Sequence, residues 1–270
     1  MPKYLHPIEI IFLRASISAL LFFIIQQLFF REKVEKKDIL TLALCGIFGV
    51  SINQLLFFEG LNLSTPIDAS IIMATIPVMV LIISIFLIKE KLTMYKSIGI
   101  LLGAAGAIIT VVYGKELASG SDELKGNIFL FINSISYSIY FVIVKPLMGK
   151  YNSFTVMKWT FFFGFLFIIP FSTHAFTNVN WAIFNGFTWS SLIYVIIATT
   201  FLAYLLIAYS MKYVNSSVAS FYIYLQPVVA TLLAILMYNE KLSFIKIISA
   251  LMIFAGIYLV GVKSEIKKSA

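Results

Sequence analysis

Apolar segments long enough to be helices alternate with short polar segments along this chain. Runs of about 20 apolar residues predict membrane-spanning helices, because only helices and closed barrels satisfy their own backbone hydrogen bonds in lipid. A barrel would show alternation over about ten residues, whereas these runs are continuous. We therefore predict an all-α polytopic membrane protein with about nine transmembrane helices. The predicted helices lie at 8–30, 39–61, 69–88, 97–113, 127–147, 155–171, 190–211, 217–238 and 244–262.

One stretch of the sequence occurs twice in similar form. PVMVLIISIFLIKEKL begins at Pro77, and PVVATLLAILMYNEKL begins at Pro227, which is 150 residues later. The same offset relates Glu90 to Glu240, and a later Lys and an Ala-Gly pair match in the same register. A fixed offset that carries Pro, Glu, Lys and Gly indicates an internal duplication.

A polar linker separates the two copies. Residues 114–126 contain glycine, serine and mixed charges without an apolar period, which marks a domain boundary. We assign 1–113 to a first repeat of four helices, 127–262 to a second repeat of five, and 263–270 to a basic tail. The helix at 127 has no counterpart 150 residues upstream. We therefore expect a five-plus-five repeat without its first helix, through a start codon placed too late or a truncated gene; a natural nine-helix protein is the alternative.

Composition and charge agree with a membrane protein. The chain is 61% hydrophobic and 12% charged, whereas about a quarter of the residues of a globular chain are charged. The net charge of +8 therefore reflects loop charge and orientation rather than nucleic-acid binding. Arg31 and Lys33 mark the first loop as cytoplasmic. We expect a multi-pass protein of the inner (plasma) membrane whose C-terminus is cytoplasmic. Lys241 and Lys246 are predicted to lie on the outer side of the membrane, because an odd number of helices per repeat inverts the second copy.

Several kinds of site are excluded by the residues that the chain lacks. The single cysteine, Cys45, excludes an intrachain disulfide, and His6 and His174 are too few for a metal cluster. No H-E-x-x-H, P-loop or G-x-G-x-x-G motif is present. We expect no enzyme activity, no metal and no cofactor, and transport that is not driven by ATP. The expected partners are a small-molecule substrate and the lipid bilayer, without nucleic acid; the oligomeric state is not indicated.

The motifs and their spacing resemble the EamA domain. In the first half these motifs are P-x-E-x-x-x-x-R beginning at Pro7, Pro66 shortly before Asp68-Ala69-Ser70, Pro77-Val78, Glu90-Lys91-Leu92, and the glycines Gly99 and Gly106. The second half repeats Ala-Ser at 219, Pro-Val at 227, Glu-Lys-Leu at 240 and the glycine at 256. The chain resembles the drug/metabolite transporter superfamily, and this resemblance implies two inverted five-helix repeats and export or uptake of small metabolites or drugs. Our interpretation is a secondary transporter that works by alternating access. The alternatives are a truncated or non-transporting membrane protein and an intramembrane enzyme.

Polar side chains near the middle of the predicted helices are the candidate substrate residues. Inverted repeats bind substrate near the bilayer midplane, where their halves meet. The candidates are Arg14, Asn53, Gln54, Asn133, Tyr137, Tyr140, Tyr204, Tyr222 and Gln226. Pro77 and Pro227 are predicted helix kinks, because proline removes a backbone donor. Paired proline-interrupted helices often lie at a transporter's site; a kink that serves packing alone is the alternative.

The polar candidates of the first repeat each have a structural alternative. Arg14 lies about 10 Å into its helix, where it either pairs with Glu9 or Glu59 or faces an anion at a cavity mouth. Asn53 and Gln54 cover adjacent faces of their helix. They either contact substrate or join helices through hydrogen bonds.

Aromatic, acidic and glycine residues give three further expectations. Tyr137 and Tyr140 share a helix face, and their mid-helix position favours cavity lining over an interfacial belt. Glu90 is directly followed by a lysine near a helix end, so we expect it to be solvated. The G-x-x-x-G spacing that begins at Gly99, together with Gly106, predicts a face for close helix packing.

Overall fold

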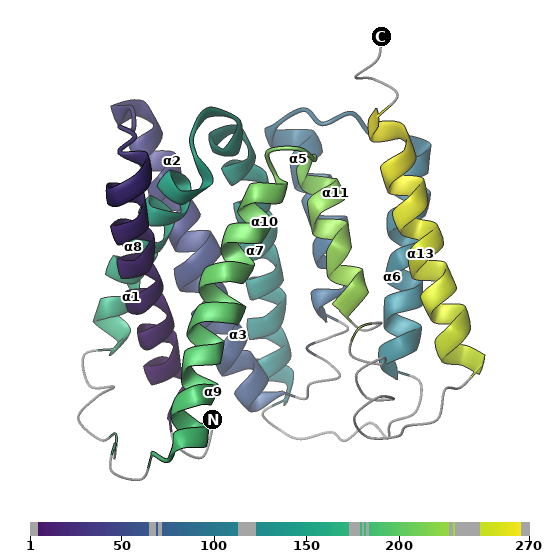
Figure 1. The fold of residues 1–270 in the computed structure, drawn as a ribbon. Coiled ribbons are helices and arrows are strands. Elements are labelled where there is room, and N and C mark those ends of the chain that lie inside the picture. The colour runs from purple at the N-terminus through teal and green to yellow at the C-terminus, as the bar shows by residue number, and fades with distance from the viewer. Residues whose placement is uncertain are drawn as a thin grey trace.

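The computed structural model describes residues 5–64, 69, 72–112, 123–172, 179, 181, 184–226, 229 and 244–265. Over these ranges the chain forms a bundle of helices without β-strands (Figure 1). Five described segments are long and apolar enough to cross a membrane: Pro7–Phe30, Lys36–Leu63, Leu124–Lys150, Ser153–Ser172 and Gly186–Ser210. The prediction of an all-α polytopic membrane protein is confirmed.

The described residues of the first half form five α-helices. They are α1 (Pro7–Ile25), α2 (Ile39–Gly46), α3 (Ile52–Leu63), α5 (Ile76–Leu87) and α6 (Met94–Val112). Helix α1 begins at a proline and ends in a wide π-helical turn, η1 (Gln26–Phe30), and a short 3-10 turn, η2 (Lys36–Asp38), leads into α2. A second π-helical turn, η3 (Ile47–Ser51), joins α2 to α3 without a break. These two α-helices therefore form one span, as the apolar run at 39–61 predicted.

The second half follows the same plan. Its helices are α7 (Glu123–Lys150), α8 (Ser153–Ser172), α9 (Gly186–Ile196), α10 (Ala203–Ser210), α11 (Ser216–Phe221) and α13 (Phe244–Glu265). The π-helical turn η5 (Ile197–Leu202) joins α9 to α10, and the 3-10 turn η6 (Tyr222–Tyr224) follows α11. Helix α7 begins at Glu123, so the end of the expected linker is helical. The predicted helix at 217–238 is described continuously only to residue 226.

Helices that are 150 residues apart in the sequence run in opposite directions. Helix α1 ascends in Figure 1, whereas α8 descends from its contact with the top of α7. Helices α6 and α13 are likewise opposed, since α6 descends in Figure 1 whereas α13 begins at the bottom and ends at the top. These opposed directions are the arrangement expected of inverted repeats.

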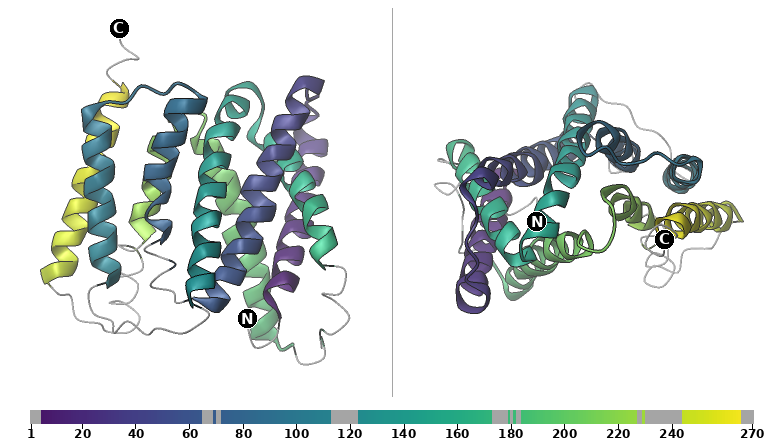
Figure 2. Two further views of the ribbon diagram at one scale, coloured as in Figure 1. Left: turned by 180° about the vertical axis from the view of Figure 1, so that it is seen from behind. Right: turned by 90° about the horizontal axis from the view of Figure 1, so that it is seen from above.

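Glycines bring α6 and α13 into close contact. The two helices lie side by side at one edge of the molecule (Figure 2). A Cβ atom added to Gly256 would lie 2.6 Å from the carbonyl oxygen of Gly99, and one added to Gly106 would lie 2.8 Å from that of Ser249. Side chains at these positions would separate the helices. The predicted glycine packing face is confirmed.

Ion pairs join two loops at the end of the bundle where α1 and α7 finish. Lys150 lies 2.8 Å from Glu35 and 2.5 Å from Asp38, and the Tyr151 hydroxyl donates to Asp38 at 2.6 Å. Hydrogen bonds from Lys150 and then Lys37 lower the pKa of Glu35. The first basic loop is thereby fixed to the α7–α8 connection.

Glu90 is buried, which corrects the expectation that it is solvated. Its side chain is 6% exposed and accepts a hydrogen bond from Lys96 at 2.6 Å, and the Lys96 side chain is 9% exposed. A charged carboxylate in an apolar environment needs a partner, and a lysine six residues later supplies it. The Glu-Lys-Leu motif therefore contributes an intramolecular ion pair between the end of α5 and the start of α6.

Candidate functional site

A cluster of polar side chains lies where α1, α3, α7 and α10 meet. The Tyr204 hydroxyl on α10 lies 3.1 Å from Asn53 Oδ1 and 3.2 Å from the Gly49 carbonyl oxygen, to which it donates. The Asn133 amide on α7 donates to the Asn53 carbonyl at 2.6 Å. Asn133 is 1% exposed and Tyr204 is 8% exposed. Residues from both halves thus form one hydrogen-bonded group in the interior.

Gln54 and Tyr204 occupy equivalent positions in the two repeats, because they are 150 residues apart. The Tyr204 hydroxyl donates to Asn53 Oδ1 at 3.1 Å, and Asn53 is the residue directly before Gln54. Equivalent residues approach one another only near the axis that relates the two copies. The polar cluster therefore lies at the pseudo-two-fold axis, at which inverted-repeat transporters bind their substrates.

The two π-helical turns beside this cluster are also equivalent. Adding 150 to the start of η3, Ile47, gives Ile197, the start of η5. In η5 the Thr200 hydroxyl donates to the carbonyl of Val195, five residues earlier, at 2.8 Å. A π-helical turn widens the helix by one residue and frequently marks a functional site. Here the two turns present Gly49 and Thr200 to the cluster.

Arg14 projects from α1 towards η5 and α3. Its Nε donates to the Thr200 hydroxyl at 2.7 Å, and its guanidinium carbon lies 4.9 Å from the centre of the Phe58 ring. Glu9 instead caps α1 by accepting from the backbone of His6 at 2.7 Å. No carboxylate of the described residues lies within 4.0 Å of the guanidinium. The expected alternative of an ion pair with Glu9 or Glu59 is therefore wrong for the described contacts.

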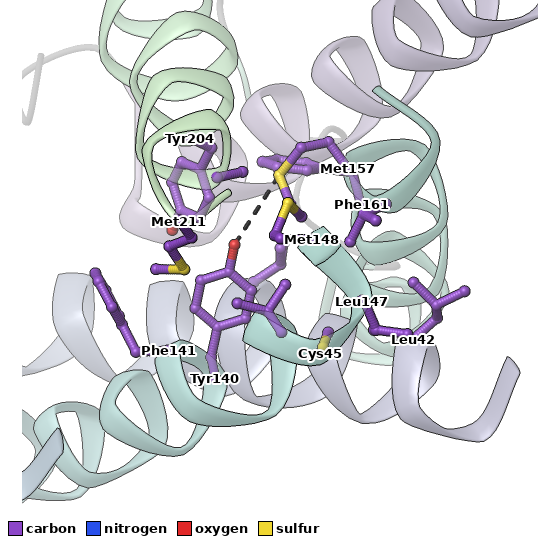
Figure 3. Close-up of a cluster of buried hydrophobic side chains, with 14 of the residues drawn as sticks. Leu42, Cys45, Tyr140, Phe141, Leu147, Met148, Met157, Phe161, Tyr204 and Met211 are labelled. Carbon is purple, nitrogen blue, oxygen red and sulfur yellow. Dashed lines mark hydrogen bonds between the residues drawn. The ribbon is translucent and has the colours of Figure 1, made fainter. Parts of the chain in front are cut away.

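Tyr137 and Tyr140 line one side of the cluster from α7. Their rings stack, with centroids 5.8 Å apart and planes inclined by 16°. Tyr140 is fully buried, and its hydroxyl lies 4.0 Å from the sulfur of Met157 (Figure 3). A Cβ atom on Gly49 would lie 2.4 Å from the Tyr140 ring. Tyr140 is thus packed in the core, whereas Tyr137 is partly exposed beside it.

The remaining candidates lie apart from this cluster. Tyr222 is 52% exposed in η6, and Gln226 is also exposed. Pro77 lies in the first turn of α5, directly after a turn in which Thr75 donates from its backbone to the Ile72 carbonyl at 3.0 Å. The helix is therefore interrupted before Pro77 rather than bent at its middle. Pro227 lies outside the described residues.

Sequence reasoning missed the residues that hold Arg14. A threonine in an apolar run commonly bonds to its own helix, and Phe58 is one of 26 phenylalanines, so neither residue stands out in the sequence. The repeat offset contains a usable signal, because it relates Gln54 to Tyr204 and so identifies the axis. Thr200 lies four residues before Tyr204, on the same side of its helix.

Polar and aromatic groups of both halves meet in this cluster. It presents a cationic guanidinium, amides, a phenol and aromatic rings. Covalent catalysis requires a nucleophile that is hydrogen-bonded to a base, and the described side-chain contacts of the cluster contain no such pair. The chemistry available is recognition by charge, hydrogen bonds and stacking.

Comparison with known proteins points to transporters. The model of the EamA-like transporter family matches residues 1–112 and 124–262. An uncharacterized transporter, YetK of Bacillus subtilis (strain 168), is 26% identical over 256 residues, which are 94% of this chain and 77% of the relative. An uncharacterized transporter of Archaeoglobus fulgidus is 26% identical over 266 residues, which are 97% of this chain and 90% of the relative.

The fold is also found among solved structures. One crystal structure superposes with a TM-score of 0.79 at 18% sequence identity, and the match covers 95% of this chain and 89% of that one. The similarity at this identity concerns the fold. The family match extends over most of the sequence in two consecutive blocks, and the described helices form an inverted repeat. The chain is a multi-pass membrane protein that belongs to the EamA-like transporter family.

Proposed function

We propose that this protein is a secondary transporter of small organic molecules, metabolites or drugs, that works by alternating access. The observation that carries the proposal is the buried hydrogen-bonded group in which Tyr204 of the second half donates to Asn53 and Gly49 of the first half, beside Gln54, the repeat equivalent of Tyr204. A site on the pseudo-two-fold axis presents similar surroundings to both sides of the membrane. Rocking of one half against the other then exposes the site to each side in turn.

The paired π-helical turns supply places at which the halves can bend. Each turn lies in the middle of a spanning segment, and each has irregular backbone bonding that weakens the helix locally. Tyr204 of one half bonds to the Gly49 carbonyl in the turn of the other half at 3.2 Å. In this proposal the transporter passes between its inward-open and outward-open states by breaking this hydrogen bond and forming the equivalent one related by the repeat.

We further propose that the transporter lies in the inner (plasma) membrane with its C-terminus in the cytoplasm. The basic connections after α1, α5, α7 and α10 all lie at the end of the bundle that also carries the C-terminus (Figure 1). An excess of Lys and Arg is typical of cytoplasmic loops. The lipid bilayer and a small-molecule substrate are the partners in this proposal, which involves neither nucleic acid nor a cofactor.

Uptake by proteoliposomes tests the proposed transport. Liposomes that contain the purified protein are incubated with a metabolite extract, washed and analysed by mass spectrometry beside empty liposomes. We expect selective accumulation by the wild type and several-fold lower accumulation by Tyr204→Phe, which loses the hydroxyl that joins the two halves. Tyr209→Phe is the control, because Tyr209 is 50% exposed on the same helix. Accumulation equal to that of empty liposomes would contradict the proposal.

A further inference from the structure

Among the described residues, no carboxylate lies within 4.0 Å of the Arg14 guanidinium. The side chain is buried, with 9% exposure, about 10 Å from the start of its helix. Among the described residues its partners are a neutral hydroxyl, that of Thr200, and the face of an aromatic ring, that of Phe58. An ionisable side chain at this depth is costly, and in membrane proteins it commonly marks a substrate or ion pathway.

The contacts of Arg14 also orient its free donors. Thr200 accepts from Nε, and Phe58 covers the guanidinium plane, so the side chain is held from two directions. No described residue accepts a hydrogen bond from Nη1 or Nη2. These two nitrogens form the end of a planar fork that matches the two oxygens of a carboxylate.

Two buried side chains, one on α1 and one on α3, have no hydrogen-bond partner in the part of the chain that the structure describes. Both amide atoms of Gln54 make no hydrogen bond of ordinary geometry, although the residue is 2% exposed. Gln54 lies one helical turn before Phe58, and hence on the same face of α3. Ser18 is 0% exposed with an unpartnered hydroxyl, and it lies one turn after Arg14 on α1. Buried polar groups are usually satisfied, so these two are suited to receive a ligand.

From this arrangement we propose that Arg14 binds the carboxylate of a small organic monoanion, and that Gln54 and Ser18 complete its hydrogen bonds. The assignment names the substrate class of the transporter and rests on the function proposed above. A single negative charge neutralises the single guanidinium, whereas a dianion would leave a net charge in an apolar interior. The Phe58 ring, which covers the guanidinium, contacts the organic part of the molecule.

Ligand-dependent unfolding of the purified full chain tests the assignment. The probes are acetate and benzoate, with acetamide and benzamide as uncharged analogues and phenyl phosphate as the dianion, at constant ionic strength and pH 7.5. A ligand at about ten times its dissociation constant raises the melting temperature by about 3 °C or more. We expect this rise with at least one carboxylate and not with its amide. Arg14→Gln should abolish the rise, and Arg31→Gln, at the exposed end of the same segment, should retain it.

A rise that persists in Arg14→Gln, or one that is equal for carboxylate and amide, would overturn the assignment. So would the absence of any rise in the wild type. To separate loss of binding from loss of folding, the melting temperature of Arg14→Gln without ligand and its elution from a sizing column are compared with those of the wild type. Gln54→Leu provides a second variant, which should weaken carboxylate binding while the charge of Arg14 remains.

Proteoliposome uptake separates failure of this assignment from failure of the proposed function. Carboxylate binding that depends on Arg14, in a protein that accumulates nothing, would contradict transport and leave the binding site standing. Accumulation of uncharged or cationic molecules alone, undiminished in Arg14→Gln, would contradict the carboxylate assignment and leave transport standing.

Discussion

The contact between α6 and α13 allows a quantitative prediction. In Gly256→Ala the added methyl group would lie 2.6 Å from the Gly99 carbonyl oxygen, whereas ordinary contact begins at 3.4 Å. The obstacle is backbone of the facing helix, so no side-chain rotation relieves it. The helices must separate by about 0.8 Å, and a gap of this size forfeits a quarter to a half of the dispersion attraction of each atom pair involved.

Overpacking of this kind costs about 1–3 kcal/mol. For a chain of this size each kcal/mol lowers the melting temperature by about 2–4 °C, so we expect Gly256→Ala to melt roughly 5 °C below the wild type. The melting temperature is measured from the fluorescence of the three tryptophans, in one detergent and at one heating rate.

Gly149→Ala is the matched control for this prediction. Gly149 is a helical glycine with nothing within 4 Å of an added Cβ atom. Because alanine is the better helix former by about 0.5–1 kcal/mol, Gly149→Ala should melt at or slightly above the wild-type temperature. Equal melting temperatures for the two variants would refute the close approach of α6 and α13.

Two further predictions concern ion pairs. Lys96→Met leaves the carboxylate of Glu90 buried without its partner and should lower the free energy of unfolding by about 3–5 kcal/mol. The double variant Lys96→Met, Glu90→Gln should recover much of that loss, and thermal unfolding of the wild type, the two single variants and the double variant measures the coupling. Lys150 lowers the pKa of Glu35, so the stabilisation by this ion pair is present above the ordinary pKa of 4.5 and is lost as the pH falls through the lowered pKa. Lys150→Met should therefore show a smaller loss of melting temperature between pH 6 and acid pH than the wild type; an unchanged pH profile would argue against this ion cluster.

The main features of the fold were predictable from the sequence because lipid imposes strong rules. The length of each apolar run predicts a spanning helix, and the basic residues of each loop predict its side of the membrane, because both rules apply to one segment at a time. The fixed repeat offset adds the relation between the two halves. The glycines of α6 predicted close packing, and the structure adds the partner, Gly256 on α13. The burial of Glu90 escaped prediction because its salt bridge depends on how the chain turns between α5 and α6, which composition does not reveal.

The site was predictable in part. Arg14, Asn53 and Tyr204 attract notice because polar groups inside membranes are costly. Which of them meet depends on helix rotation, and the π-helical turns change this rotation by an amount that sequence spacing does not specify. Spacing therefore does not identify Thr200, and it predicts a substrate role for Tyr222, which is exposed in the structure.

Two-sided accessibility of the polar cluster tests alternating access most directly. A single cysteine is introduced as Gln54→Cys in a Cys45→Ala background, and a charged, membrane-impermeant thiol reagent is added to right-side-out and to inside-out vesicles. Leu206→Cys is the control, because Leu206 lies two residues after Tyr204 and is 63% exposed on the surface of the bundle. We predict that the cysteine at 54 reacts from both sides, whereas the one at 206 reacts from neither. Reaction of the cysteine at 54 from one side only, or from neither side, would contradict transport by alternating access.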